Sequence, residues 1–195
     1  MAEKNNVKVV FLGESGVGKS SLIDRYFKDR FDEKISKTLV GSLFTHRIDY
    51  AEKNYVFEIW DTPGSQNLRA LTKLFMNDVK IVVLVYDITI KSTFLELQHW
   101  LDIILEGHPN TNLILVGNKL DLSSNRKIKE KEAKKFAEII KAEFTEISAK
   151  DNYGWNNFLD NAFNDYIAYI KKKEEEEEEE EDELLDIIDR EVFLL

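Results

Sequence analysis

The stretch VKVVFLGESGVGKSSLIDRYF, residues 7–27, joins a strand pattern to a helical pattern through a loop rich in glycine. VKVVFL (7–12) is a continuous apolar run of strand length, and SLIDRYF (21–27) fits a helix. The loop between them, GESGVGKS, matches the pattern G-x-x-x-x-G-K-[ST]. Placed between a strand and a helix, this pattern indicates a phosphate-binding loop, and an ordinary glycine turn is the alternative interpretation.

The chemistry of such a loop comes mainly from its backbone. Glycines let the N–H groups close around a polyphosphate, and the positive end of the following helix faces the same anion. Lys19 is expected to reach the β- and γ-phosphates, and the Ser20 hydroxyl is expected to ligate Mg²⁺. The candidate phosphate-binding residues are Gly13, Glu14, Ser15, Gly16, Val17, Gly18, Lys19, Ser20 and Ser21.

The remainder of the chain continues the alternation of strands and helices. Further strand patterns occur at 43–50, 55–60, 80–88, 112–118 and 144–148, and further helical patterns at 93–105, 132–144 and 155–170. The strands at 43–50 and 55–60 are expected to form a hairpin. Continuous apolar strands separated by helices predict an α/β fold with a mostly parallel sheet covered on both faces. Ligands of such sheets bind beyond the carboxyl ends of the strands.

The motif NKLD (118–121) indicates that the bound base is guanine. It follows the strand pattern 112–118, and the Asp121 carboxylate can accept two hydrogen bonds from N1 and the 2-amino group of guanine. Adenine has no such donors and would leave the carboxylate unpaired. ISAK (147–150) ends the next strand pattern, where the Ala149 N–H can meet the guanine carbonyl. The candidate guanine-binding residues in these motifs are Asn118, Lys119, Asp121, Ser148, Ala149 and Lys150.

Taken in order, the motifs resemble those of the Ras superfamily of small GTPases, and of its Rab branch in particular. The resemblance covers residues 5–172 and is carried by GESGVGKS, WDTPG, LVYDIT, NKLD and ISAK. It implies a P-loop G domain with a six-stranded sheet that binds GTP or GDP with Mg²⁺, hydrolyses GTP, and acts as a switch in vesicle trafficking or signalling. Exchange factors, activating proteins and effectors would bind through residues 31–45 and 61–78.

The resemblance also assigns roles to residues outside the short motifs. Thr38 resembles the threonine that ligates Mg²⁺ only when the γ-phosphate is present, and Asp61 the carboxylate of the metal site. Gly64 resembles the backbone donor to the γ-phosphate. Phe31 resembles the aromatic residue that packs on guanine, with a place in the core as the alternative.

One departure concerns hydrolysis. The family sequence DTAGQ reads DTPGS here, so Ser65 stands where a glutamine normally orients the attacking water. Serine has a shorter side chain and lacks the amide's paired donor and acceptor. Slow intrinsic hydrolysis is therefore expected. Gln66, one residue later, is the alternative water-positioning residue, beside the catalytic candidates Lys19, Thr38 and Gly64.

Another departure concerns membranes and partners. The chain has no cysteine, which excludes disulfides and prenylation, and Ala2 excludes N-myristoylation. We therefore expect a cytoplasmic protein without an autonomous membrane anchor, which reaches membranes only through partner proteins. The switch I sequence TLVGSLF (38–44) also differs from that of Rab proteins, so known Rab effectors cannot be inferred.

The charge of the chain is concentrated at its end. The net charge is −10, yet residues 174–195 carry 13 acidic residues and one basic residue, so residues 1–173 are close to neutral. No basic stripe indicates nucleic-acid binding. Residues 1–173 are expected to form the G domain, and 174–195 a tail that is disordered when unbound. Because LLDIIDREVFLL (184–195) has an apolar stripe, the tail is alternatively expected to bind a partner or the body of the protein itself. In the second case the basic segment 126–135 would receive the glutamate run.

Overall fold

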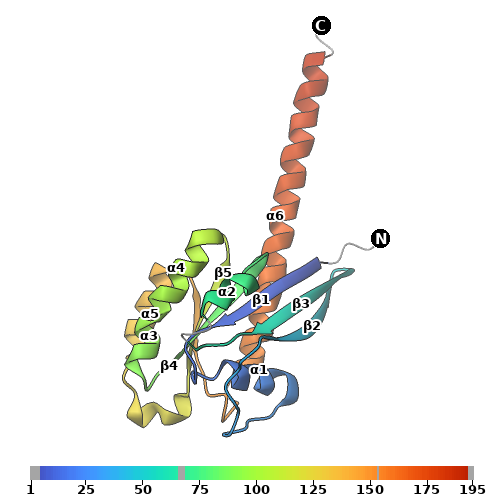
Figure 1. Ribbon diagram of the computed structural model, residues 1–195. Coiled ribbons are helices and arrows are strands. Elements are labelled where there is room, and N and C mark those ends of the chain that lie inside the picture. The colour runs from blue at the N-terminus through green and yellow to red at the C-terminus, as the bar shows by residue number, and fades with distance from the viewer. Residues whose placement is uncertain (1–4, 66–68, 153, 193–195) are drawn as a thin grey trace. The chain divides into compact units, whose positions relative to one another are not determined.

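The computed structural model describes the backbone of residues 5–65, 69–152 and 154–192, with side chains except those of 69–71 and 182–192. It divides into two compact units, residues 1–155 and 156–195, each of which is described by itself. Figure 1 shows the first unit as a twisted sheet with helices. Its strands are β1 (Asn5–Leu12), β2 (Ser42–Tyr50), β3 (Lys53–Asp61), β4 (Val79–Asp87), β5 (Asn112–Asn118) and β6 (Glu143–Glu146).

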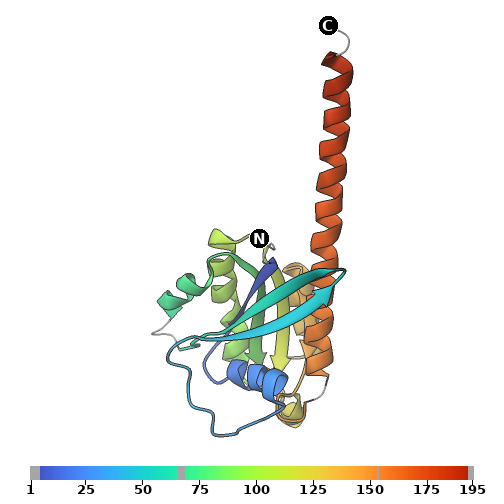
Figure 2. The same ribbon diagram turned by 90° about the vertical axis from the view of Figure 1, so that its right-hand side faces the viewer.

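The sheet is mostly parallel and contains one hairpin, as the sequence predicts. Its strand order is β2-β3-β1-β4-β5-β6, and every neighbouring pair is parallel except β2 and β3. Figure 2 shows these two strands as a long antiparallel hairpin. Ala51 and Glu52 form its two-residue turn, both with positive φ, because such a turn matches the twist of the flanking strands. The α/β P-loop fold class is thus confirmed.

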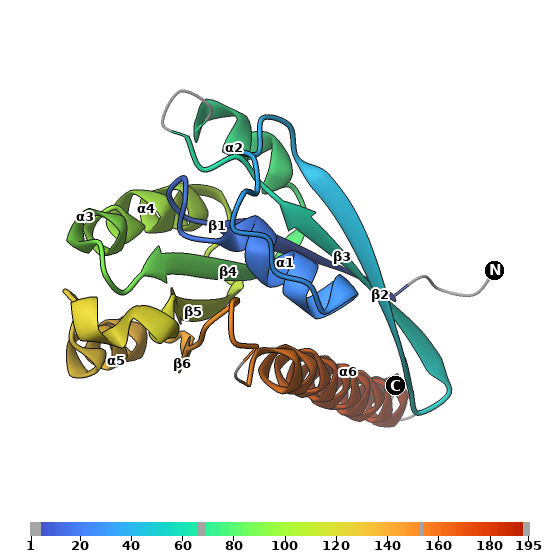
Figure 3. The ribbon, with the colours of Figure 1, turned by 90° about the horizontal axis from the view of Figure 1, so that it is seen from below.

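Both faces of β1 and β4 are buried, because helices cover the sheet on each side. Continuous apolar strands predict this arrangement. Val10, Leu12 and alternate residues of β4 pack with Trp100 and Ala133 of helices α4 and α5 in one hydrophobic cluster. Phe11 faces the other way, toward the Trp155 ring, whose Nε1 donates to the Leu22 carbonyl of α1. Figure 3 shows that α1 lies apart from the group formed by α3, α4 and α5. The helices of this unit are α1 (Lys19–Lys28), α2 (Arg69–Phe75), α3 (Lys91–Leu95), α4 (Leu97–Gly107) and α5 (Glu130–Ile139), with a 3-10 helix, η2 (Leu120–Asn125).

Several helix boundaries differ from the sequence-based expectation. The single helix expected at 93–105 is divided at Glu96, where His99 N–H bonds the Glu96 carbonyl in an i,i+3 pattern. The helix expected at 132–144 ends at Ile139, because Lys141 has a φ of 55° and β6 begins at Glu143.

Helix α6 (Trp155–Val192) continues as one backbone helix through the glutamate run (Figure 1). The sequence instead places a boundary at residue 173. Glutamate favours helix, and Lys172 and Lys173 form i,i+4 ion pairs with Glu176 and Glu177 at 3.4 and 3.2 Å. A separate, disordered tail over 174–195 stays a prediction. Within the described part of the chain, none of the helices has the length and apolar character needed to cross a bilayer.

Candidate functional site

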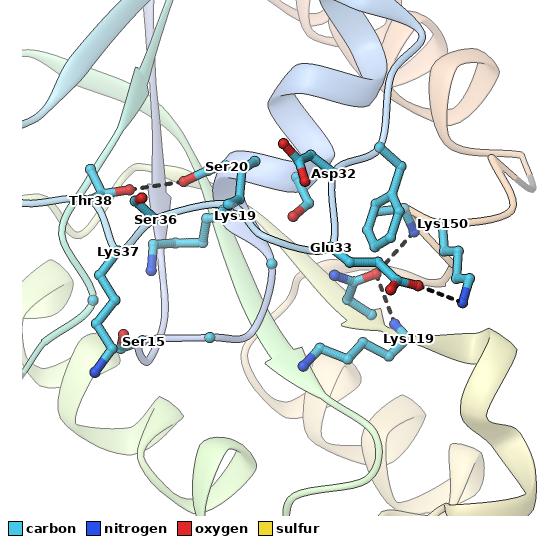
Figure 4. A pocket seen from close by; sticks show the side chains of 18 of the residues that line it. Ser15, Lys19, Ser20, Asp32, Glu33, Ser36, Lys37, Thr38, Lys119 and Lys150 are labelled. Atoms are coloured by element: carbon cyan, nitrogen blue, oxygen red, sulfur yellow. Dashed lines mark hydrogen bonds and ion pairs between the residues drawn. The ribbon is translucent and has the colours of Figure 1, made fainter.

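A cavity of about 480 Å³ lies where the loops after the strands meet (Figure 4). Its lining comes from five separate segments, which follow β1, α1, β3, β5 and β6. This is the edge of a parallel sheet at which ligands bind in α/β folds. The lining residues lie within 15–21, 31–38, 118–122 and 149–150, together with Gly64.

Lys19 lies at the base of the phosphate-binding loop. Its Nζ donates hydrogen bonds to the carbonyls of Gly13 at 2.8 Å and Glu14 at 3.2 Å, and the residue is only 6% exposed. Burial lowers the pKa of Lys19 to about 8, although the charges of Asp61 and Glu14 act in the opposite direction. Gly64 approaches so closely that a Cβ there would lie 2.4 Å from Lys19 Nζ. The loop therefore holds a buried cation against the cavity, as a phosphate site requires.

Three oxygen-bearing side chains converge beside this loop, from α1, from the segment before β2 and from the end of β3. Ser20 Oγ donates to Asp61 Oδ2 at 2.6 Å, and Thr38 Oγ1 donates to the same oxygen at 3.2 Å. The Ser20 and Thr38 hydroxyls are 2.9 Å apart (Figure 4). The other carboxylate oxygen, Asp61 Oδ1, is buried and has no hydrogen-bond partner among the residues that the structure describes, and burial raises the pKa of Asp61. An unpartnered buried oxygen beside two hydroxyls suits a hard cation.

At the other end of the cavity, Asn118 connects three segments. Its Nδ2 donates to the Val17 carbonyl at 2.8 Å, and its Oδ1 accepts from the N–H groups of Lys119 at 2.7 Å and Ala149 at 3.2 Å. A Cβ on Gly18 would lie 2.2 Å from Asn118 Nδ2, so a glycine allows this contact. Asn118 thus fixes the base-binding motifs to the phosphate loop.

The remaining base-site residues are also oriented by neighbours. The Ser148 hydroxyl donates to Asp121 Oδ1 at 2.8 Å, and the Lys119 amine pairs with the buried Asp87 carboxylate at 2.7 Å. Arg25 donates from Nε to the Ala149 carbonyl and from Nη2 to the Lys150 carbonyl, both at 2.9 Å. These contacts hold the Asp121 carboxylate and the backbone of 149–150 in fixed positions before a ligand is bound.

The structure brings most of the predicted site residues to one cavity. Those in its lining are Ser15, Gly16, Gly18, Lys19, Ser20, Ser21, Phe31, Thr38, Gly64, Asn118, Lys119, Asp121, Ala149 and Lys150. The other predicted residues lie behind the lining: Gly13, Glu14 and Val17 provide carbonyl acceptors, while Ser148 and Asp61 bond lining residues. Ser65 follows the lining residue Gly64 but does not itself line the cavity. Gln66 lies outside the described residues.

Other residues of the site had no assigned role in the sequence. Asp32, Glu33, Ile35, Ser36 and Lys37, from the segment between Phe31 and Thr38, line the cavity, as does Leu122. The sequence indicated a role for residues 32–37 only through their position between Phe31 and Thr38, which were both predicted site residues. Arg25 had no such signal, since it contacts Ala149 across 124 positions of the chain.

Comparison with known proteins identifies the family. The Ras family profile matches residues 8–171. The chain is 39% identical to Ras-related protein Rab-22A of Homo sapiens over 146 residues, which are 74% of this chain and 75% of that protein. It is 43% identical to human Ras-related protein Rab-17 over 148 residues, which are 75% of this chain and 69% of that protein. The chain therefore belongs to the Ras superfamily of small GTPases, within which it is similar to the Rab proteins.

Proposed function

We propose that this protein is a Rab-like molecular switch that binds GTP and GDP, hydrolyses GTP slowly, and acts in vesicle trafficking or signalling. The observation that supports it is the meeting of the phosphate loop, Thr38, NKLD and Ala149 around one cavity. The base end offers the carboxylate that guanine recognition needs, and the phosphate end offers the buried cation Lys19.

Magnesium is proposed as the cofactor. Ser20 and Thr38 would hold the ion through their hydroxyls, with Asp61 supporting the site. When bound, the ion would neutralise phosphate charge. No group of three or more His, Asp or Glu side chains in the described residues could hold a metal alone. This fits a site that phosphate oxygens complete.

Slow hydrolysis is expected from the two residues that flank Gly64, which are Pro63 and Ser65. Ser65 has a short side chain outside the cavity lining, and Pro63 before Gly64 is buried, with its φ fixed and no N–H. A serine at this place cannot extend an amide to a water molecule at the γ-phosphate. The chemical step would thus lack a positioning group that is present in the family template.

Single-turnover GTP hydrolysis tests this assignment in the wild type, Ser65→Gln and Gln66→Ala. Ser65→Gln should hydrolyse GTP at least about tenfold faster, because a positioned group for the water is restored. Gln66→Ala should leave the rate unchanged. A Ser65→Gln protein that is no faster, combined with a much slower Gln66→Ala protein, would show that Gln66 positions the water instead.

A scaffold that stays bound to GTP with negligible turnover is the second candidate. The same serine favours it, since a lost hydrolysis step would fix the GTP form. The nucleotide retained after purification distinguishes the two candidates. Mostly GDP supports a cycling enzyme, whereas mostly GTP supports the scaffold.

Regulators and effectors are proposed to bind residues 31–45 and 61–78. This surface exposes apolar side chains, among them Leu39, Val40, Leu43 and Leu74 at 72, 79, 48 and 73%. The Trp60 and Phe75 rings contact each other with centroids 5.5 Å apart. A Cβ on Gly41 would lie 2.4 Å from the Phe75 ring, so the altered switch I sequence brings its backbone directly against α2. We expect regulators and effectors whose surfaces complement these exposed apolar side chains and the contact between Gly41 and Phe75.

The location and the tail remain proposals made on sequence. We propose a cytoplasmic protein that partner proteins bring to membranes. The acidic tail, residues 174–195, is proposed on its apolar stripe and its charge to bind a partner or the basic segment 126–135. Deleting the tail should then change effector binding or nucleotide exchange, more strongly at low salt. No change in either at low salt would contradict the proposal.

A further inference from the structure

Lys37 differs from the other lysines of the cavity lining. Lys19 bonds two backbone carbonyls, Lys119 pairs with Asp87, and Lys150 pairs with Glu33. Lys37 also lines the cavity, but among the described residues it has no ion pair or side-chain hydrogen bond. Its positive charge is therefore available to a ligand.

The neighbours of Lys37 place it at the phosphate end of the cavity. It directly precedes Thr38, whose hydroxyl lies 2.9 Å from that of Ser20 on the phosphate loop. In Figure 4 the Lys37 side chain extends from its backbone in the direction of the loop that carries Ser15. The base end is formed instead by residues after β5 and β6, such as Asp121 and Ala149.

The ligand of this cation follows from the chemistry of the two nucleotides. GDP ends at its β-phosphate, which the proposed function assigns to Lys19 and the loop, whereas GTP carries one further phosphoryl group, which the proposed function places beside Thr38. A lysine is a flexible point charge suited to phosphate. We propose that Lys37 Nζ binds the γ-phosphate of GTP and thereby favours the GTP-bound form over the GDP-bound form. This inference rests on the proposed function.

A contact between Lys37 and the γ-phosphate would lengthen the lifetime of the GTP-bound form, as Ser65 is also proposed to do. Ser65 slows removal of the γ-phosphate by hydrolysis, and Lys37 slows release of the intact GTP. Both residues lengthen the life of the GTP form, one through chemistry and the other through binding.

Dissociation of fluorescent GDP and of the fluorescent non-hydrolysable analogue GppNHp, measured with Mg²⁺ on the full chain, tests the proposal. Lys37→Ala should release GppNHp about five- to tenfold faster, as expected for loss of a charge-assisted hydrogen bond, while GDP release changes less than about twofold. Lys37→Arg should restore slow release. The GppNHp effect should shrink as salt is raised.

Lys34→Ala is the matched control, because Lys34 is an exposed lysine of the same segment that does not line the cavity. It should leave both rates unchanged. Equal acceleration of GDP and GppNHp by Lys37→Ala, or no acceleration, would overturn the γ-phosphate contact while leaving the proposed function intact. A wild-type protein that binds neither nucleotide would overturn both.

Discussion

The base end and the phosphate end of the cavity are organised differently. At the base end, Asn118 and Asp121 are fixed by hydrogen bonds from other residues of the chain. At the phosphate end, Lys19 is buried against carbonyls, and Asp61 Oδ1 has no hydrogen-bond partner in the described part of the chain. A site fixed in advance loses little freedom on binding and discriminates sharply. At the phosphate end, we expect these groups to gain partners when phosphate and Mg²⁺ bind.

The two ends of the cavity therefore have different expected tasks: the base end recognises guanine, and the phosphate end hydrolyses GTP. The base end carries the groups proposed to bind guanine, and it lies away from the departure at Ser65. The altered residue stands after Gly64, at the phosphate end. We therefore expect changes at the base end to affect GDP and GTP analogues equally, and changes at the phosphate end to distinguish them.

The largest effect is expected from Asp121→Ala. It removes the acceptor of two hydrogen bonds from guanine, so GDP and GppNHp should each bind more than about 100-fold more weakly. Equilibrium titration with fluorescent nucleotides measures this. Asp151→Ala, an exposed aspartate of the neighbouring loop, is the control and should have no effect. A loss restricted to GppNHp would contradict the division of the cavity into two ends.

A smaller effect is expected from Arg25→Leu. The side chain is 11% exposed and donates to the carbonyls of Ala149 and Lys150, so its loss frees the base-site backbone. Both nucleotides should dissociate about tenfold faster. Arg25→Lys should be intermediate, since lysine lacks the planar fork of donors.

Arg47→Leu, on the exposed side of β2, is the control for Arg25. If Arg25→Leu lowers the melting temperature but leaves dissociation unchanged, Arg25 stabilises the fold without positioning the base site. Partial recovery of slow dissociation in Arg25→Lys, with the same melting temperature as Arg25→Leu, would support the positioning role.

The smallest effect is expected from Glu33→Gln. The Glu33 and Lys150 side chains are 73 and 49% exposed, and their 3.0 Å ion pair joins the segment before Thr38 to the base-site loop. Exposed pairs contribute little, so release of either nucleotide should change less than about threefold. A larger acceleration, measured by stopped flow, would mean that this pair restrains the opening of the cavity.

The sequence predicts the structure best where the pattern is local. Residues 112–118 form β5 as expected, and residues 13–20 join a strand to a helix. It did not indicate α2, which has only seven residues and lies beside the undescribed segment 66–68. It also missed Arg25 and Lys37. Neither belongs to a short motif, and the role of each depends on segments that meet only after folding.

Some properties of this protein were set by the sequence alone: the P-loop fold, the guanine motifs, and the serine in place of a glutamine. These depend on residues that are neighbours in the chain, where strand and helix periodicity and loop chemistry act directly. Only the tertiary structure decided that Ser20, Thr38 and Asp61 meet at one point, where Asp61 Oδ1 has no partner among the described residues. It also decided that Lys37 lines the cavity with no ion pair to any other described residue. The physical reason is that these groups come from distant parts of the chain, and the packing of α1 and β3 in the fold determines which of them come within bonding distance.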